Sequence, residues 1–132
     1  ICGMMQVTDW EGVYGLPADI IKSAAPCSGM YELEPVRFSH RNTYLDLTEK
    51  AAARNSSIRH IPSYGPPLTM AWGTGELDEF QRQSRAFAAA WEAAGHSVDT
   101  FILEDLNHFQ VAREIFNPEQ PVFRNILKNI GV

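Results

Sequence analysis

The stretch from residue 66 to residue 103 restricts the fold of this chain more than any other part of it. Two prolines at 66 and 67 precede the apolar run 68–73 (LTMAWG), which has the length of a buried strand and ends at a glycine. A helical pattern follows over residues 79–94, and residues 98–103 form a second strand-like run. Two strands joined through a helix pair in parallel by a right-handed crossover. The stretch therefore predicts an α/β fold.

The helix over residues 79–94 has the clearest periodicity in the chain. We expect Asp78 to cap its first turn and Gly95 to end it. Spacings of three and four place its apolar and small residues on one face, which would pack against the sheet. That face consists of Phe80, Ser84, Phe87, Ala88 and Trp91.

The rest of the chain predicts one partial α/β domain over residues 1–132, with parallel strands covered by helices on both faces. Residues 1–10 show helical spacing without an N-cap, and residues 20–27 indicate a short strand. Residues 30–66 are mixed polar and aromatic, with short helices expected near 44–47 and 49–55; this excursion from the sheet suggests a cap. A final helix is expected over 122–130. Three parallel strands make a small sheet, so we expect further strands from a missing N-terminal half.

Composition excludes several classes of function. The net charge is −5 and the isoelectric point is near 5.3, and no basic cluster is available for nucleic acid. No apolar run approaches the roughly 20 residues of a membrane helix. Cys2 and Cys27 are too few for a disulfide framework and lack metal-ligand spacing, so no metal or cofactor is predicted. Free thiols favour a cytoplasmic location, although any signal peptide would lie on an upstream segment. Whether the chain forms a homo-oligomer stays open.

Glu76 and His108 are the candidate catalytic residues. Each follows an apolar run by a few residues, and functional sites of open parallel sheets form at the carboxyl ends of strands. A carboxylate beside imidazole Nδ1 holds the ring in one tautomer, which leaves Nε2 to accept a proton from a nucleophile. The pair thus matches the acid and base of a Ser-His-acid hydrolase. Spacing alone also fits a polar loop in which His108 only closes a strand end.

The other candidates have weaker support. Asp105 lies close to His108 but suits a turn-former, and Asp99 and Asp78 rank lower. No Gly-x-Ser-x-Gly nucleophile elbow occurs in the chain, and Ser28 has neither a preceding glycine nor a following helix. A Cys27 nucleophile is disfavoured because a thiol inside an apolar strand is normally inert. We expect structural or surface roles for the remaining histidines, His40, His60 and His96.

Three stretches resemble the α/β-hydrolases of the kynurenine formamidase type and their esterase and lipase relatives. They are residues 28–35 (SGMYELEP), 75–84 (GELDEFQRQS) and 107–109 (NHF), and the likeness runs over nearly the whole chain. The resemblance assigns the acid to Glu76 and the base to His108. It suggests Tyr31, Asn107 and Phe109 as substrate contacts.

In this family the nucleophile elbow immediately precedes the helix that residues 1–10 resemble, and the oxyanion-hole His-Gly-Gly segment lies further upstream. The resemblance therefore implies a serine hydrolase of small esters or amides, formamides included, acting through an acyl-enzyme. An N-terminal half carrying Gly-x-Ser-x-Gly would be its partner, and we expect the isolated chain to be inactive. A non-catalytic interaction domain with a degenerate hydrolase fold, or an esterase without formamidase activity, are the alternatives.

Overall fold

Strand β1 (Leu68–Gly73) is the centre of the fold, and all of its residues are buried. In the computed structural model, which describes residues 1–132, β1 pairs in parallel with β2 (Val98–Leu103). Leu68 lies opposite Val98 and Gly73 opposite Leu103, so the two strands end together. The bounds of both strands agree with the sequence prediction. β2 is less buried, and its Ile102 is 52% exposed.

The other edge of β1 carries an extended segment, residues 24–27, in place of the predicted strand 20–27. Only two isolated parallel bridges form, between Ala24 and Leu68 and between Cys27 and Ala71. The Ala24 N–H donates to the carbonyl of Pro67, just before β1, and the Ser28 N–H donates to that of Ala71. Pro26, which lies between them, has no N–H to donate. The missing donor interrupts the ladder, so the segment pairs with β1 without becoming a continuous strand.

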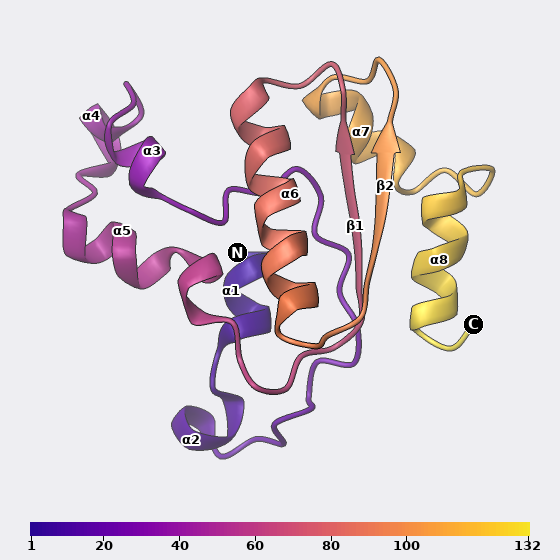
Figure 1. Ribbon diagram of the computed structural model, residues 1–132, viewed down its shortest axis with the longest axis horizontal. Helices are drawn as coiled ribbons and strands as arrows, with labels where there is room; N and C mark the ends of the chain where they lie inside the picture. Colours follow the sequence, from indigo (N-terminus) through magenta and orange to yellow (C-terminus); the bar gives the residue numbers. More distant parts are fainter.

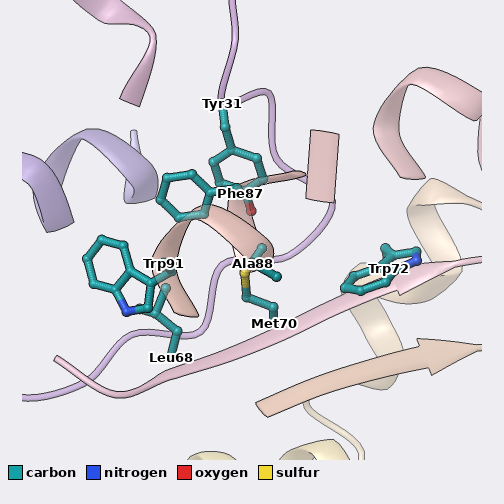
Figure 2. Close-up of a cluster of buried hydrophobic side chains, with 7 residues drawn as sticks. All are labelled: Tyr31, Leu68, Met70, Trp72, Phe87, Ala88 and Trp91. Atoms are coloured by element: carbon teal, nitrogen blue, oxygen red, sulfur yellow. The ribbon is translucent and has the colours of Figure 1, made fainter. Parts of the chain in front are cut away.

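Helices cover both faces of the strand pair. Figure 1 shows α6 (Asp78–Ala93) on one side of the strands, with α7 (His108–Glu114) and α8 (Pro121–Asn129) on the other. Successive side chains of β1 point to opposite faces. Leu68, Met70 and Trp72 contact one apolar cluster, and Ala71 contacts the other. The α6 cluster, drawn in Figure 2, also contains Tyr31, Phe87, Ala88 and Trp91; the second cluster contains Val111, Ile115 and Val122.

Helix α6 lies where the sequence predicts it, with one difference at its start. The N-cap position belongs to Leu77, and Asp78 is the first helical residue, so the expected side-chain cap by Asp78 is wrong. Asp78 and Glu79 instead place negative charge in the first turn, where the helix dipole favours it. Gly95 ends the helix with φ of 85°, a left-handed conformation that glycine adopts without steric cost.

The N-terminal segment contains two helices. The helix expected over residues 1–10 ends earlier, as α1 (Cys2–Val7), because Thr8 is extended. A second helix, α2 (Trp10–Tyr14), follows, and Asp9 caps it by accepting a hydrogen bond from the Gly12 N–H at 2.7 Å. Asp9, the N-cap of α2, therefore lies only two residues after the end of α1.

Residues 30–66 leave the sheet and pack beyond α6 (Figure 1). They form α3 (Glu34–Arg37), α4 (Asn42–Leu45), α5 (Glu49–Asn55) and the short 3-10 helix η1 (Ser57–His60). Gln83 of α6 fixes the start of this segment, since its Oε1 accepts hydrogen bonds from the N–H groups of Tyr31 and Glu32 at 2.7 and 2.8 Å. A cap role for the segment stays a prediction. None of the helices combines the length and apolar composition that crossing a membrane requires.

Candidate active site

Glu76 lies in the tight turn that follows β1, and its side chain is fully buried. The turn folds back on the strand end, so the N–H of Gly73 donates to Glu76 Oε2 at 2.9 Å. Gln81 of α6 fixes the same turn, because its Nε2 donates to the carbonyl oxygens of Glu76 and Thr74 at 2.9 and 3.2 Å. Strand β1 therefore holds the carboxylate of Glu76, and helix α6 holds the backbone of the turn.

His108 is the first residue of α7, and its Nδ1 lies 2.6 Å from Glu76 Oε1. Its side chain is 46% exposed, and Nε2 makes no hydrogen bond within the chain. The ring of Phe80 packs against the imidazole with the ring centroids 4.6 Å apart. The imidazole thus has one nitrogen fixed by a buried carboxylate, one face covered by an aromatic ring, and its other nitrogen available.

Main-chain contacts between the two loops bring these side chains together. The N–H of Thr74 donates to Leu103 at 3.0 Å, and that of Gly75 donates to Leu106 at 3.1 Å. A Cβ at Gly73 would lie 2.0 Å from the Leu106 carbonyl oxygen, so only glycine permits this approach. Parallel pairing ends both strands at one edge, and the glycine lets their loops touch.

Ser28 is the third polar side chain of the site. Its Oγ donates to Glu76 Oε2 at 2.7 Å, and the residue is almost fully buried. Sequence reasoning weighed Ser28 only as a nucleophile and gave it no role beside the acid. Its position directly after the segment that flanks β1 was the available signal, because that segment ends at the same edge of the sheet.

Helix α7 is not among the helices predicted from the sequence. Its signal is a capping box: Asn107 Oδ1 accepts from the N–H of Gln110 at 3.1 Å, and Gln110 Oε1 accepts from the N–H of Asn107 at 2.9 Å. The spacing of these two polar residues is visible in the sequence. The box fixes the backbone on either side of His108.

The suggested substrate contacts lie at different depths. Asn107 caps α7, while the ring of Phe109 is 85% exposed and stands edge-on to His108 at 5.9 Å. Tyr31 is 2% exposed and stacks on Phe87 in the core at 4.2 Å, where burial raises its pKa. The structure thus brings Asn107 and Phe109 to the site and places the Tyr31 side chain in the apolar core. Substrate contact by the three residues stays a prediction.

The remaining candidates lie apart from the acid and base chemistry. Asp105 adopts a φ of 58°, as a turn residue does, and its N–H donates a hydrogen bond to Thr74 Oγ1 at 2.8 Å. Burial raises the pKa of the Cys27 thiol, which disfavours a thiolate nucleophile. His96 Nε2 lies 2.8 Å from the Pro62 carbonyl, and His60 Nε2 lies 3.3 Å from that of Ala53. No cluster of three or more metal-ligating side chains occurs.

Similar proteins are found among both sequences and solved structures. Kynurenine formamidases from Danio rerio and Salmo salar are 29% and 27% identical to the chain, with 99% of this chain and 46% of each relative covered. A protein from a Silicibacter species described as a candidate thioesterase shares the fold with a TM-score of 0.68 and 22% identity, over 78% of this chain and 37% of its own. No family model matches the chain.

The esterase Est2 of Thermogutta terrifontis has the same arrangement with a TM-score of 0.56 and 22% identity, over 83% of this chain and 42% of the esterase. The chain has the fold of the C-terminal part of an α/β-hydrolase. It spans about half the length of the curated relatives that it matches. In this α/β-hydrolase portion, Glu76 and His108 follow two neighbouring parallel strands at the sheet edge where such folds place their sites.

Proposed function

We propose that the protein containing this chain is a serine hydrolase of small esters or amides, in which Glu76 orients His108 and a serine outside these residues is the nucleophile. The contact of 2.6 Å between Glu76 Oε1 and His108 Nδ1 carries the proposal. It places a buried carboxylate on one imidazole nitrogen and leaves the other accessible. The likeness to formamidases and esterases supports hydrolysis of this type.

In the proposed reaction His108 Nε2 takes the proton of the serine hydroxyl as the serine oxygen attacks the substrate carbonyl carbon. The imidazolium then gives this proton to the leaving amine or alcohol, and an acyl-enzyme forms. Water, activated by the same nitrogen, hydrolyses the acyl-enzyme. Glu76 holds the tautomer with hydrogen on Nδ1 and stabilises the imidazolium by its charge.

The proposal assigns the nucleophile to another segment, and it is supported by the absence of a hydrogen bond between His108 Nε2 and any serine or cysteine of this chain. The hydroxyl nearest to the pair, that of Ser28, already donates to the carboxylate. We therefore propose an N-terminal half with a Gly-x-Ser-x-Gly elbow as the partner. The isolated chain should hydrolyse no substrate.

An apolar cavity of about 170 Å³ adjoins the site and supports a small substrate group. Phe80 belongs to its wall and also packs on His108, so the cavity and the imidazole share one side chain. A cavity of about 150 Å³ in another protein binds benzene, which gives the scale of one aromatic ring or a short acyl chain. The apolar part of the lining consists of Met30, Pro35, Val36, Leu77 and Phe80.

This size suits both an arylformamide and a short acyl or aryl ester. The curated relatives are named kynurenine formamidases, whereas the solved neighbours include esterases. N-formylkynurenine and p-nitrophenyl esters should therefore be compared as substrates of the same preparation. Turnover of aryl esters alone would favour an esterase without formamidase activity.

The proposal is tested by Glu76→Gln and His108→Gln in a protein that contains the nucleophile segment. We expect each variant to lose about 10⁴-fold in kcat. In Glu76→Gln the amide favours the wrong tautomer of His108, and in His108→Gln the new side chain cannot act as a base. Asp105→Asn is the control, because asparagine tolerates the left-handed turn and removes a carboxylate from the same loop.

A fluorophosphonate should label the wild type and label the two site variants much more slowly. Unchanged kcat in both variants would contradict the proposal and favour an interaction domain with a degenerate fold. Robust hydrolysis by residues 1–132 alone would contradict the assignment of the nucleophile to another segment.

A further inference from the structure

The carboxylate of Glu76 has different partners on its two oxygens. Oε2 accepts hydrogen bonds from Ser28 Oγ at 2.7 Å and from the Gly73 N–H at 2.9 Å, whereas Oε1 contacts His108 Nδ1 at 2.6 Å. The Glu76 side chain is fully buried and Ser28 is 4% exposed. The three partners come from the segment beside β1, from β1 itself and from α7.

From this division we propose that Ser28 is a positioning residue for the acid of the hydrolase. Glutamate has one more rotatable bond than aspartate, and the torsion that turns its carboxylate is broad. Two donors on Oε2 restrict that torsion and keep Oε1 directed at the imidazole. Without Ser28, Gly73 would be the only donor on Oε2, and the carboxylate torsion would be less restricted. The inference rests on the proposed function, since positioning matters only if His108 is the base.

The backbone of Ser28 supports this assignment. Its φ is 45°, in the left-handed region that serine rarely adopts and glycine adopts freely. The strained position is held by β1, because the Ser28 N–H donates to the Ala71 carbonyl at 3.0 Å next to the bridge between Cys27 and Ala71. A glycine would relieve the backbone but would lose the hydroxyl. What the serine adds at this position is its hydrogen bond to Glu76.

Two variants separate the hydroxyl from the backbone. Ser28→Ala removes the hydroxyl and keeps an unfavourable φ, whereas Ser28→Gly removes the hydroxyl and suits the φ. Both should lower kcat by about 10- to 100-fold, the size of effect seen when an outer partner of a site is removed. KM should change little because Ser28 is buried beneath the carboxylate and does not reach the substrate cavity.

Ser84→Ala is the matched control. Ser84 is also buried, lies on α6, and its hydroxyl has no hydrogen-bond partner. It should keep the wild-type kcat. If Ser28→Ala fails to fold, Ser28→Gly still tests the hydroxyl without the backbone cost.

Nuclear magnetic resonance of ¹⁵N-histidine-labelled protein supplies a readout that does not depend on turnover. In the wild type we expect His108 to hold its hydrogen on Nδ1, with a low-field proton resonance that is assigned by its loss in His108→Gln. In Ser28→Gly this resonance should broaden or move upfield, and the Nε2–H tautomer should become populated. A residue with a merely structural role, such as Ser84, should leave the resonance unchanged.

The two readouts distinguish failure of this inference from failure of the proposed function. A protein without hydrolase activity, whose His108 resonance still depends on Ser28, would contradict the proposed function and leave the positioning contact in place. An active hydrolase in which both Ser28 variants keep the wild-type kcat and tautomer would overturn the inference. Recovery of kcat in Ser28→Gly but not in Ser28→Ala would also overturn it, because the backbone would then be the cause.

Discussion

Glu76 shows how single contacts position a buried charge. A carboxylate removed from water is costly unless its oxygens receive hydrogen bonds, and here Ser28 and Gly73 serve one oxygen while His108 contacts the other. The thiol of the neighbouring Cys27 is 3.7 Å from Ser28 Oγ. Burial is the main cause that raises the pKa of this thiol, and the charge of Glu76 raises it further.

The thiol chemistry is a prediction at the residue scale. Because burial raises the pKa values of Cys2 and Cys27, both thiols should stay protonated at pH 7, and iodoacetamide should alkylate them slowly. The rate should rise only at a pH above the ordinary thiol range. Peptide mass spectrometry measures the labelling, with urea-unfolded protein as the control in which both cysteines react readily. Rapid labelling of Cys27 in folded protein at pH 7 would contradict the assignment of a partly buried, inert thiol.

At the scale of elements, α7 couples the stability of a short helix to the position of the imidazole. The helix has seven residues and begins at His108 itself. Isolated helices of this length are not stable in water, so packing and capping must hold it. Val111 packs it on the sheet, and the reciprocal hydrogen bonds of Asn107 and Gln110 satisfy its free N–H groups.

Removal of this cap is the prediction at the element scale. Asn107→Ala should lower the free energy of unfolding by about 1 kcal/mol, because the first turn of α7 loses its acceptor. Asn107→Asp keeps an acceptor at the N-cap and should retain the wild-type stability. Urea-induced unfolding followed by circular dichroism measures both. Equal destabilisation by the two substitutions would show that the amide has a role other than capping.

At the scale of the whole molecule, two apolar clusters on opposite faces of β1 hold the strand ends in register. The larger cluster joins β1, α6 and Tyr31, and within it Phe87 stacks on Tyr31 and contacts Trp91. The same α6 carries Phe80 against His108 and Gln81 against the Glu76 turn. Packing of one helix therefore positions both sides of the candidate site.

Truncation in this cluster is the prediction at the whole-molecule scale. Phe87→Ala should lower the free energy of unfolding by about 3 to 5 kcal/mol, since it removes a fully buried ring and leaves a cavity. Phe109→Ala is the matched control: its ring is 85% exposed, and its loss should change stability by less than about 0.5 kcal/mol. Chemical denaturation measures both. A small loss with Phe87→Ala would mean that the cluster does not hold the sheet.

The elements that the sequence predicts well are those in which local pattern and tertiary packing agree. The runs 68–73 and 98–103 match β1 and β2, and α6 keeps the apolar face read from its periodicity. The differences between the predicted and observed elements lie at Pro26, Thr8 and Asn107. Proline breaks a ladder that only pairing reveals, Thr8 divides the first helix, and Asn107 begins a helix too short for its periodicity to show.

The sequence by itself determined the α/β class, the two central strands and the order in which Glu76 and His108 follow them, because these depend on local periodicity and on the handedness of one crossover. Only the tertiary structure decided which oxygen of Glu76 contacts the imidazole, and that Ser28 and Gly73 share the other. Those contacts join residues that are 48 and 32 positions apart as well as near neighbours. Distances between such residues are set by strand register and core packing, which no local pattern encodes.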